Sequence, residues 1–208
     1  MYLFSRVVHL AGPPAEIVPW AIDMRNHVAS VTGRDIALWV AQFGAPVGSF
    51  VYSMRVEGLA DLASATESLT ADPEYHAKIA AAAPFAGSPA EDNLARPLHG
   101  ELGDSPPVGA VATVTTAAIA GRYVDAVTWS IDIARHVESL IGTPVMFLSN
   151  EYGQFGSVSW IGVSADAAAA DAAADAVNGD AAYIAKLEAA TGLFEPGSST
   201  RVLLTRIA

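Results

Sequence analysis

Two helical phrases in this sequence place an aspartate four residues before a histidine. The first phrase, WAIDMRNHVASVTG, contains Asp23 and His27, and the second, WSIDIARHVESLIG, contains the same pair. Side chains four residues apart meet on one face of a helix, here with the acid on the favourable N-terminal side. An aspartate can hold a histidine in one tautomer and raise its basicity, as general-base catalysis requires. We therefore predict four catalytic residues, which are Asp23, His27, Asp132 and His136.

The same spacing also has a purely structural interpretation. An ion pair between residues i and i+4 stabilises a helix by about 0.2–0.5 kcal/mol wherever it lies. The apolar stripe of the first helix runs through Met24 and Val28, so Asp23 and His27 lie at its flank. A flank position can face a neighbouring element, a partner subunit or solvent. The sequence therefore leaves both interpretations of the pair open.

The two phrases belong to an internal duplication. Half of their residues are identical, and further matches follow in the same order at a nearly constant offset. The segment 72–79, for example, matches the segment 180–187. The join lies in GELGDSPPVG, which has the composition of a linker. We therefore predict two repeats, residues 1–103 and residues 104–208.

Each repeat contains strand, helix, strand, strand, helix and strand in that order. Runs of β-branched and aromatic residues indicate the strands, and apolar residues at helical spacing indicate first helices that end at Gly33 and Gly142. Asp72 and Asp180 interrupt each second helix, where they can cap a short final helix. In the first repeat we expect strands at 2–9, 36–43, 49–56 and 93–100, and helices at 13–33 and 59–82. In the second we expect strands at 110–116, 145–152, 157–164 and 200–207, and helices at 121–142 and 166–190.

The order βαββαβ defines a ferredoxin-like unit. The run IALWVAQF is apolar at both odd and even positions, which indicates a strand covered on both faces. We therefore predict an α+β protein in which two tandem βαββαβ ferredoxin-like repeats form one pseudo-twofold α+β barrel. Helices should cover one face of each sheet, and the two other faces should pack against each other.

This order of elements, the repeat length and the duplication resemble the dimeric α+β barrel superfamily, which includes antibiotic-biosynthesis monooxygenase-like and NIPSNAP-like proteins. In many members two chains form the barrel, and a tandem copy would let one chain form it alone. The resemblance covers nearly the whole chain and implies a pocket between sheet and helices. It also implies chemistries that include cofactor-independent oxygenation, isomerisation and haem degradation, among which the fold does not choose.

Large aromatic side chains, most of them matched between the repeats, are the candidates for lining such a pocket. They lie on the first helices, on the strands and at the start of the short final helices. The same rings could instead fill the core, which is the commoner role of large aromatic residues. The predicted substrate-pocket residues are Trp20, Trp129, Trp39, Tyr52, Trp160, Tyr75 and Tyr183.

The sequence predicts no cofactor and no metal. His76 in the second helical region is similar to a feature of haem-degrading members, so haem is the alternative, but the rest of that pattern has no clear counterpart here. His9 and His99 occur in one copy only, and the five histidines have no metal-ligand spacing. Phosphate-binding loops, His-Glu-x-x-His and Gly-x-Ser-x-Gly are absent from the sequence.

Composition limits the partners. The net charge of −11 disfavours nucleic acid and anionic membranes, because both repel an acidic chain. The chain has no cysteine, which excludes disulfides and thiolate chemistry. Its N-terminus has the pattern of a strand rather than a signal peptide, and no uncharged apolar run approaches the ~20 residues of a membrane helix. We therefore expect a cytoplasmic protein.

These observations leave two classes of function. One is a small-molecule enzyme or binding protein acting on an apolar or aromatic compound, and the resemblance implies cofactor-independent monooxygenation or isomerisation. The other is a non-catalytic structural or assembly protein that uses the duplicated helix face for contacts in a homo-oligomer. The sequence does not decide whether the chain is an enzyme.

Overall fold

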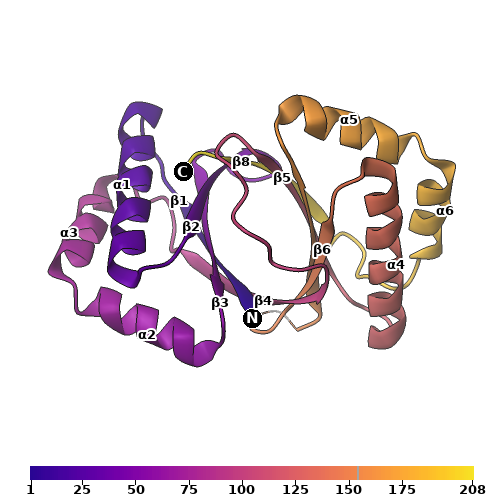
Figure 1. Cartoon of the computed structure of the whole chain (residues 1–208), viewed down its shortest axis with the longest axis horizontal. Coiled ribbons are helices and arrows are strands. Elements are labelled where there is room, and N and C mark those ends of the chain that lie inside the picture. Colours follow the sequence, from indigo (N-terminus) through magenta and orange to yellow (C-terminus); the bar gives the residue numbers. More distant parts are fainter. Residues whose placement is uncertain (154) are drawn as a thin grey trace.

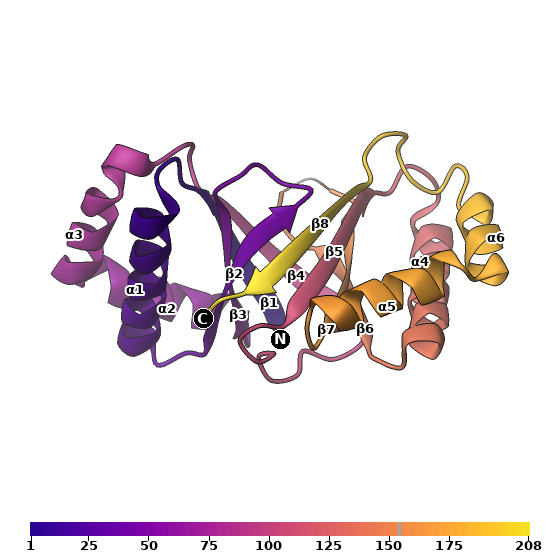
Figure 2. The same ribbon diagram turned by 90° about the horizontal axis from the view of Figure 1, so that it is seen from above.

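Eight antiparallel strands form one closed barrel, with helices packed on two opposite sides of it (Figure 1, Figure 2). The computed structural model describes residues 1–153 and 155–208. The first half comprises β1 (Tyr2–His9), α1 (Pro14–Thr32), β2 (Ile36–Phe43), β3 (Ser49–Val56), α2 (Leu59–Thr70), α3 (Pro73–Ala81), a 3-10 turn (Ala83–Phe85) and β4 (Glu91–His99). The second half comprises β5 (Val111–Ala118), α4 (Tyr123–Ile141), β6 (Val145–Asn150), β7 (Ser157–Ser164), α5 (Ala167–Asn178), α6 (Ala181–Ala189) and β8 (Thr200–Arg206).

The strand order confirms the predicted tandem α+β barrel. Around the barrel it is β1-β3-β2-β8-β5-β7-β6-β4. The first half therefore contributes the sheet β4-β1-β3-β2, and the second contributes β8-β5-β7-β6. The pairs β2–β8 and β4–β6 join the two sheets edge to edge. Helices α1, α2 and α3 cover the outer face of the first sheet, and α4, α5 and α6 cover that of the second (Figure 1).

Capping residues set the helix ends where the sequence predicts them. Gly33 and Gly142 follow α1 and α4 with φ of 66° and 70°, a left-handed conformation that glycine adopts without steric cost. Asp72 accepts hydrogen bonds from the backbone N–H groups of Glu74 and Tyr75 at the start of α3. Asp180 accepts one at the start of α6. These caps divide the second helical region of each repeat into two helices.

Small differences from the predicted bounds occur at strand ends. The strand predicted at 145–152 ends at Asn150, because a turn begins there. The first strand of the second repeat runs from Val111 to Ala118 rather than over 110–116, because it pairs with β7 along its whole length. The last strand of the first repeat begins at Glu91, where it pairs with β1.

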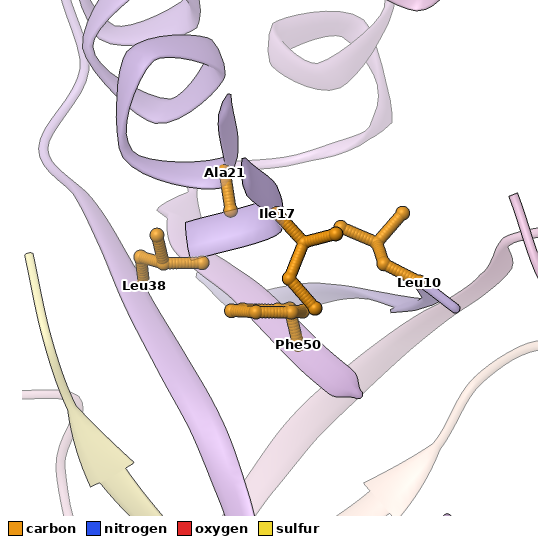
Figure 3. Packing of buried hydrophobic residues seen from close by; sticks show 5 residues of the cluster. All are labelled: Leu10, Ile17, Ala21, Leu38 and Phe50. Atoms are coloured by element: carbon orange, nitrogen blue, oxygen red, sulfur yellow. The ribbon is translucent and has the colours of Figure 1, made fainter. Parts of the chain in front are cut away.

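The outer face of each sheet forms a core with its first helix. In the first half, Leu38 and Phe50 on the sheet pack beneath Ile17 and Ala21 of α1 (Figure 3). In the second half, Phe147 packs with Val158 and Ala117, and its ring lies 5.3 Å from that of Trp160. Within the described residues, no helix has both the length and the apolar character needed to cross a membrane.

Replacing a ring in this second core should destabilise the fold strongly. Phe147 is fully buried, so Phe147→Ala should lower the free energy of unfolding by about 3–5 kcal/mol. The control is Phe155→Ala, because Phe155 is 94% exposed in the β6–β7 turn and should change stability by less than about 0.5 kcal/mol. Urea unfolding measures both values. Equal losses in the two variants would contradict this core assignment.

Candidate functional site

The duplicated phrase connects helices within each half. On α1, His27 Nε2 lies 2.9 Å from an Asp72 carboxylate oxygen, at the N-cap of α3. Asp23 forms an ion pair with Lys78 of α3. The predicted pairing of Asp23 with His27 is therefore wrong. Both side chains point across to α3, where partners of opposite charge are available, instead of along their own helix.

The second copy repeats these contacts. His136 Nε2 lies 2.8 Å from Asp180 at the N-cap of α6, and Asp132 forms an ion pair with Lys186. The pairing predicted between Asp132 and His136 is wrong for the same reason. Because a carboxylate only accepts hydrogen bonds, each histidine Nε2–H donates to its aspartate. We call these contacts the helix clamp, with one copy between α1 and α3 and one between α4 and α6.

The tryptophans of the phrase complete the clamp. Trp20 Nε1 donates to the backbone carbonyl of Lys78, and Trp129 Nε1 donates to that of Lys186, each at 3.0 Å. Every polar group of the phrase singled out in the sequence therefore contacts the short final helix of its own half. Such reciprocal contacts stabilise a helix pair, and they account for the tryptophan, aspartate and histidine side chains of the phrase.

Each half contains an apolar cavity between its sheet and its helices. The first chamber, of about 480 Å³, lies among β1, β3 and helices α1 to α3. The second, of about 460 Å³, lies among β5, β7 and helices α4 to α6. Both volumes are typical of small-molecule sites. None of the four residues predicted to be catalytic lines either chamber.

Six of the seven aromatic residues predicted to line a pocket do line these chambers. The first chamber has Trp20, Tyr52 and Tyr75 in its wall, and the second has Trp129, Trp160 and Tyr183. The seventh, Trp39, is buried inside the barrel with Ala37, Ala112 and Leu204. Its position on β2 turns the ring to the face opposite α1, and its Nε1 donates to Ser53 Oγ at 3.0 Å.

Tyr52 and Trp160 hold the first helix of their half to the sheet. Tyr52 Oη donates to the Ala21 carbonyl of α1, and Trp160 Nε1 donates to the Ser130 carbonyl of α4, each at 3.1 Å. Burial, with a smaller contribution from Tyr75, raises the pKa of Tyr52 well above its ordinary value. Tyr52 therefore keeps its proton at physiological pH and retains this hydrogen bond to α1.

A histidine that the sequence did not single out for catalysis lines the first chamber. His9, at the end of β1, places Nδ1 2.8 Å from Ser49 Oγ. Ser49 Oγ lies 2.6 Å from the Pro46 carbonyl, which can only accept, so the serine proton is donated there. Ser49 must then accept from His9 Nδ1–H. In the neutral ring the lone pair therefore resides on Nε2, which has no hydrogen-bond partner among the described residues.

An arginine and a tyrosine add polar groups to the same chamber. Arg6 donates from Nε and Nη2 to both oxygens of Asp92, each at 2.7 Å, across the β1–β4 pair. The hydrogen bonds to Asp92 raise the pKa of Arg6 above its ordinary value. Arg6 Nη1 donates to Tyr75 Oη at 3.3 Å. Because that oxygen accepts from Arg6, the hydroxyl proton of Tyr75 is available to a ligand.

The second chamber lacks the histidine. Ala118 occupies the position that matches His9, and the one charged side chain among the described lining residues is Arg201. His76 contacts the backbone carbonyl of Thr70 and lies outside both chambers. Nowhere in residues 1–153 and 155–208 do three or more acidic, histidine or cysteine side chains gather as a metal site would require.

Comparisons with known proteins identify the fold. A monooxygenase of Fusobacterium nucleatum, so named only provisionally, matches with 11% identity, 100% of this chain, 92% of the other and a TM-score of 0.68. An anthrone oxidase-like protein matches with 12% identity and a TM-score of 0.69. The match covers 100% of this chain and 91% of the other. A similarly named monooxygenase of Lactobacillus acidophilus matches with 12% identity and a TM-score of 0.62. The match covers 99% of this chain and 93% of the other.

These similarities extend over the whole chain but are too distant in sequence to assign an activity. No protein-family model matches the sequence, and no curated protein matches it. The chain is therefore a tandem α+β barrel, and it is similar in fold to proteins provisionally named as monooxygenases. The fold alone does not determine its chemistry.

The helix clamp makes stability sensitive to acid. The hydrogen bond from His136, followed by the backbone N–H of Tyr183, lowers the pKa of Asp180 from its ordinary value of 3.8. A carboxyl whose folded pKa is lowered stabilises the fold above the unfolded pKa, and this contribution is lost as pH falls through the folded pKa. Asp180→Asn should therefore flatten the fall in Tm between about pH 5 and pH 2.

Calorimetry over that pH range tests the clamp. Asp171→Asn is the control, because Asp171 lies on exposed α5 and makes no ion pair in the described part of the chain. It should keep the wild-type acid dependence. If the Tm of Asp180→Asn falls with pH as steeply as that of the wild type, the carboxylate does not stabilise the folded state.

Proposed function

We propose that the first chamber is the active site of a cofactor-independent enzyme that removes a proton from an apolar aromatic compound. The observation that carries this proposal is the position of His9 at the edge of the chamber, at the end of β1, with Nδ1–H held by Ser49. A neutral imidazole with a free Nε2 is a general base that operates near neutral pH. The wall around it is apolar, which suits a ring system as the substrate.

Tyr75 is the proposed electrophilic partner of this base. Removal of a proton from a carbon that is conjugated with a carbonyl places negative charge on the carbonyl oxygen, and a hydroxyl donor at that oxygen stabilises the enolate as it forms. Tyr75 has its proton free for this role because Arg6 supplies the hydrogen bond that its oxygen accepts. Asp92 fixes the guanidinium with two hydrogen bonds and balances its charge, so the chamber stays neutral and accepts an uncharged substrate.

The oxygenase form of this chemistry needs no resident cofactor. His9 Nε2 takes one proton from an activated methylene group, and the electron-rich enolate transfers electrons to O₂ and forms a carbon–oxygen bond. The histidinium returns its proton to give a hydroperoxide. Loss of the second methylene proton to His9 breaks the O–O bond, so the products are a ketone and water. The anthrone oxidase-like structural relative suggests anthrones, which contain such a methylene, as the first substrates to test.

The isomerase form uses the same base without O₂, because the histidinium reprotonates the enolate at another carbon. The assembly alternative requires neither chamber chemistry nor turnover. Its original support, the duplicated helix face, is occupied by the helix clamp within the chain. Exposed apolar side chains do occur on the β2–β3 and β6–β7 hairpins, namely Phe43, Val47, Tyr152 and Phe155. A homo-oligomer therefore remains a prediction, to be examined by native mass spectrometry.

Oxygen uptake with anthrone tests the proposed site. Wild-type protein should consume one O₂ per molecule of anthraquinone formed, and His9→Gln should lower kcat by about a hundredfold or more, because general-base catalysis contributes that much. Tyr75→Phe should lower kcat by about ten- to a hundredfold through loss of the enolate donor. Both rates are followed with an oxygen electrode and by absorbance of the quinone.

His76→Gln is the matched control, since His76 is exposed and lies outside the chamber, and its kcat should stay at the wild-type value. A thermal melt of each variant separates loss of the base from loss of the fold. Turnover that survives in a folded His9→Gln protein would refute the proposed base. Anthrone consumption without O₂ uptake would favour the isomerase form.

A further inference from the structure

The second chamber differs from the first in charge, although the duplication places the same elements around it. Among the described residues that line it, Arg201 is the only charged one. Its Nε donates to Thr115 Oγ1 at 3.1 Å. That bond leaves both Nη groups without a partner among the described residues. Arg201 forms no ion pair in residues 1–153 and 155–208, so a fixed guanidinium of full positive charge faces this chamber.

In the first chamber the arginine is neutralised by an ion pair with Asp92. Arg6 is opposite Asp92 in the β1–β4 register, and Thr115 is opposite Arg201 in the β5–β8 register. These two cross-strand pairs occupy matching places in the two repeats. The first pair combines a cation with an anion, while the second combines a cation with a hydroxyl. The first chamber therefore accepts a neutral compound, and the second lacks a counter-ion for its arginine.

Smaller side chains shape the apolar part of the second chamber. The cross-strand pair Phe4–Met54 of the first sheet is matched by Thr113–Gly162 in the second. A Cβ atom added at Gly162 would meet no atom within 4 Å, which shows open space at that point of the wall. On the helical side, α5 supplies alanine side chains to the wall. An extended apolar group fits a cavity bounded in this way.

The second chamber also lacks a general base. Its described lining contains no histidine, aspartate or glutamate. Arg201 is an exposed residue at the edge of the cavity, whereas Trp129 and Ile133 lie deeper on α4. A ligand with an anionic end and an apolar body would therefore place its charge at the rim and its body inside. Such an arrangement binds a ligand without transforming it.

We propose that the second chamber is a binding site for an apolar carboxylate, held by the Nη groups of Arg201. A guanidinium matches the planar carboxylate with two parallel hydrogen bonds, and this geometry favours carboxylates over neutral groups of the same shape. The proposal does not depend on catalysis in the first chamber, because none of its residues line that chamber. The two halves of the chain thus hold two chemically different ligands.

Calorimetric titration of the full chain with 2-naphthoate and with neutral 2-naphthalenemethanol tests the site. Arg201→Gln should weaken naphthoate binding by about tenfold or more and naphthalenemethanol binding by less than about twofold, because only the anion uses the charge-assisted hydrogen bonds. Gly162→Met restores the methionine of the first sheet, fills the open space and should weaken both ligands by about tenfold.

Arg6→Gln is the control, because it removes the arginine that lines the other chamber and should leave naphthoate affinity unchanged. Three results would overturn the proposal. These are absence of naphthoate binding to the wild type, an unchanged ratio of the two affinities in a folded Arg201→Gln variant, and loss of naphthoate binding in Arg6→Gln instead. Failure of the anthrone assay has no bearing on any of these measurements.

Discussion

Backbone pairing at the sheet edges is the constraint on which the rest of this structure depends. Each half forms a four-stranded sheet that would by itself expose the unpaired N–H and C=O groups of two edge strands. The pairs β2–β8 and β4–β6 satisfy these groups and close the barrel. Closure leaves only the outer faces of the sheets for the helices (Figure 2). One chain therefore acquires two separate chambers between sheet and helices.

The helix clamp explains why the short final helices persist beside these chambers. A helix of nine residues such as α3 or α6 is marginal alone, so it depends on contacts with its neighbours. The histidine, aspartate and tryptophan of the duplicated phrase provide three polar contacts to each of them. The clamp thus positions Tyr75 and Tyr183, which follow the capping aspartates, against the chambers. In this way the clamp helps to form the walls of both chambers.

The fold could be predicted from the sequence because its determinants are local or repeated. Apolar periodicity, glycine stops such as Gly33, and capping aspartates such as Asp72 each act within one element. The internal duplication then implied that two sheets share one barrel. The partners of the phrase could not be predicted this way, because the rotation of α1 against α3 decides whether Asp23 meets His27 or Lys78. Tertiary packing sets that rotation, and the i,i+4 spacing of two residues on one helix does not predict tertiary packing.

The duplication also explains why the matched residues of the phrase form the same scaffold contacts in both halves. A position that keeps its residue in both copies must satisfy the fold twice, as His27 and His136 do at their helix caps. A position that differs between the copies does not have to make the same contact in both halves. Its residue can therefore suit one chamber alone. His9 with Ala118, and Asp92 with Arg201, are such positions, and the chambers are lined by His9 in the first half and by Arg201 in the second. The pseudo-twofold symmetry thus holds for the scaffold and breaks at the walls of the two chambers. His9 and the Arg6–Asp92 ion pair border the first chamber, and an arginine without an ion-pair partner among the described residues borders the second.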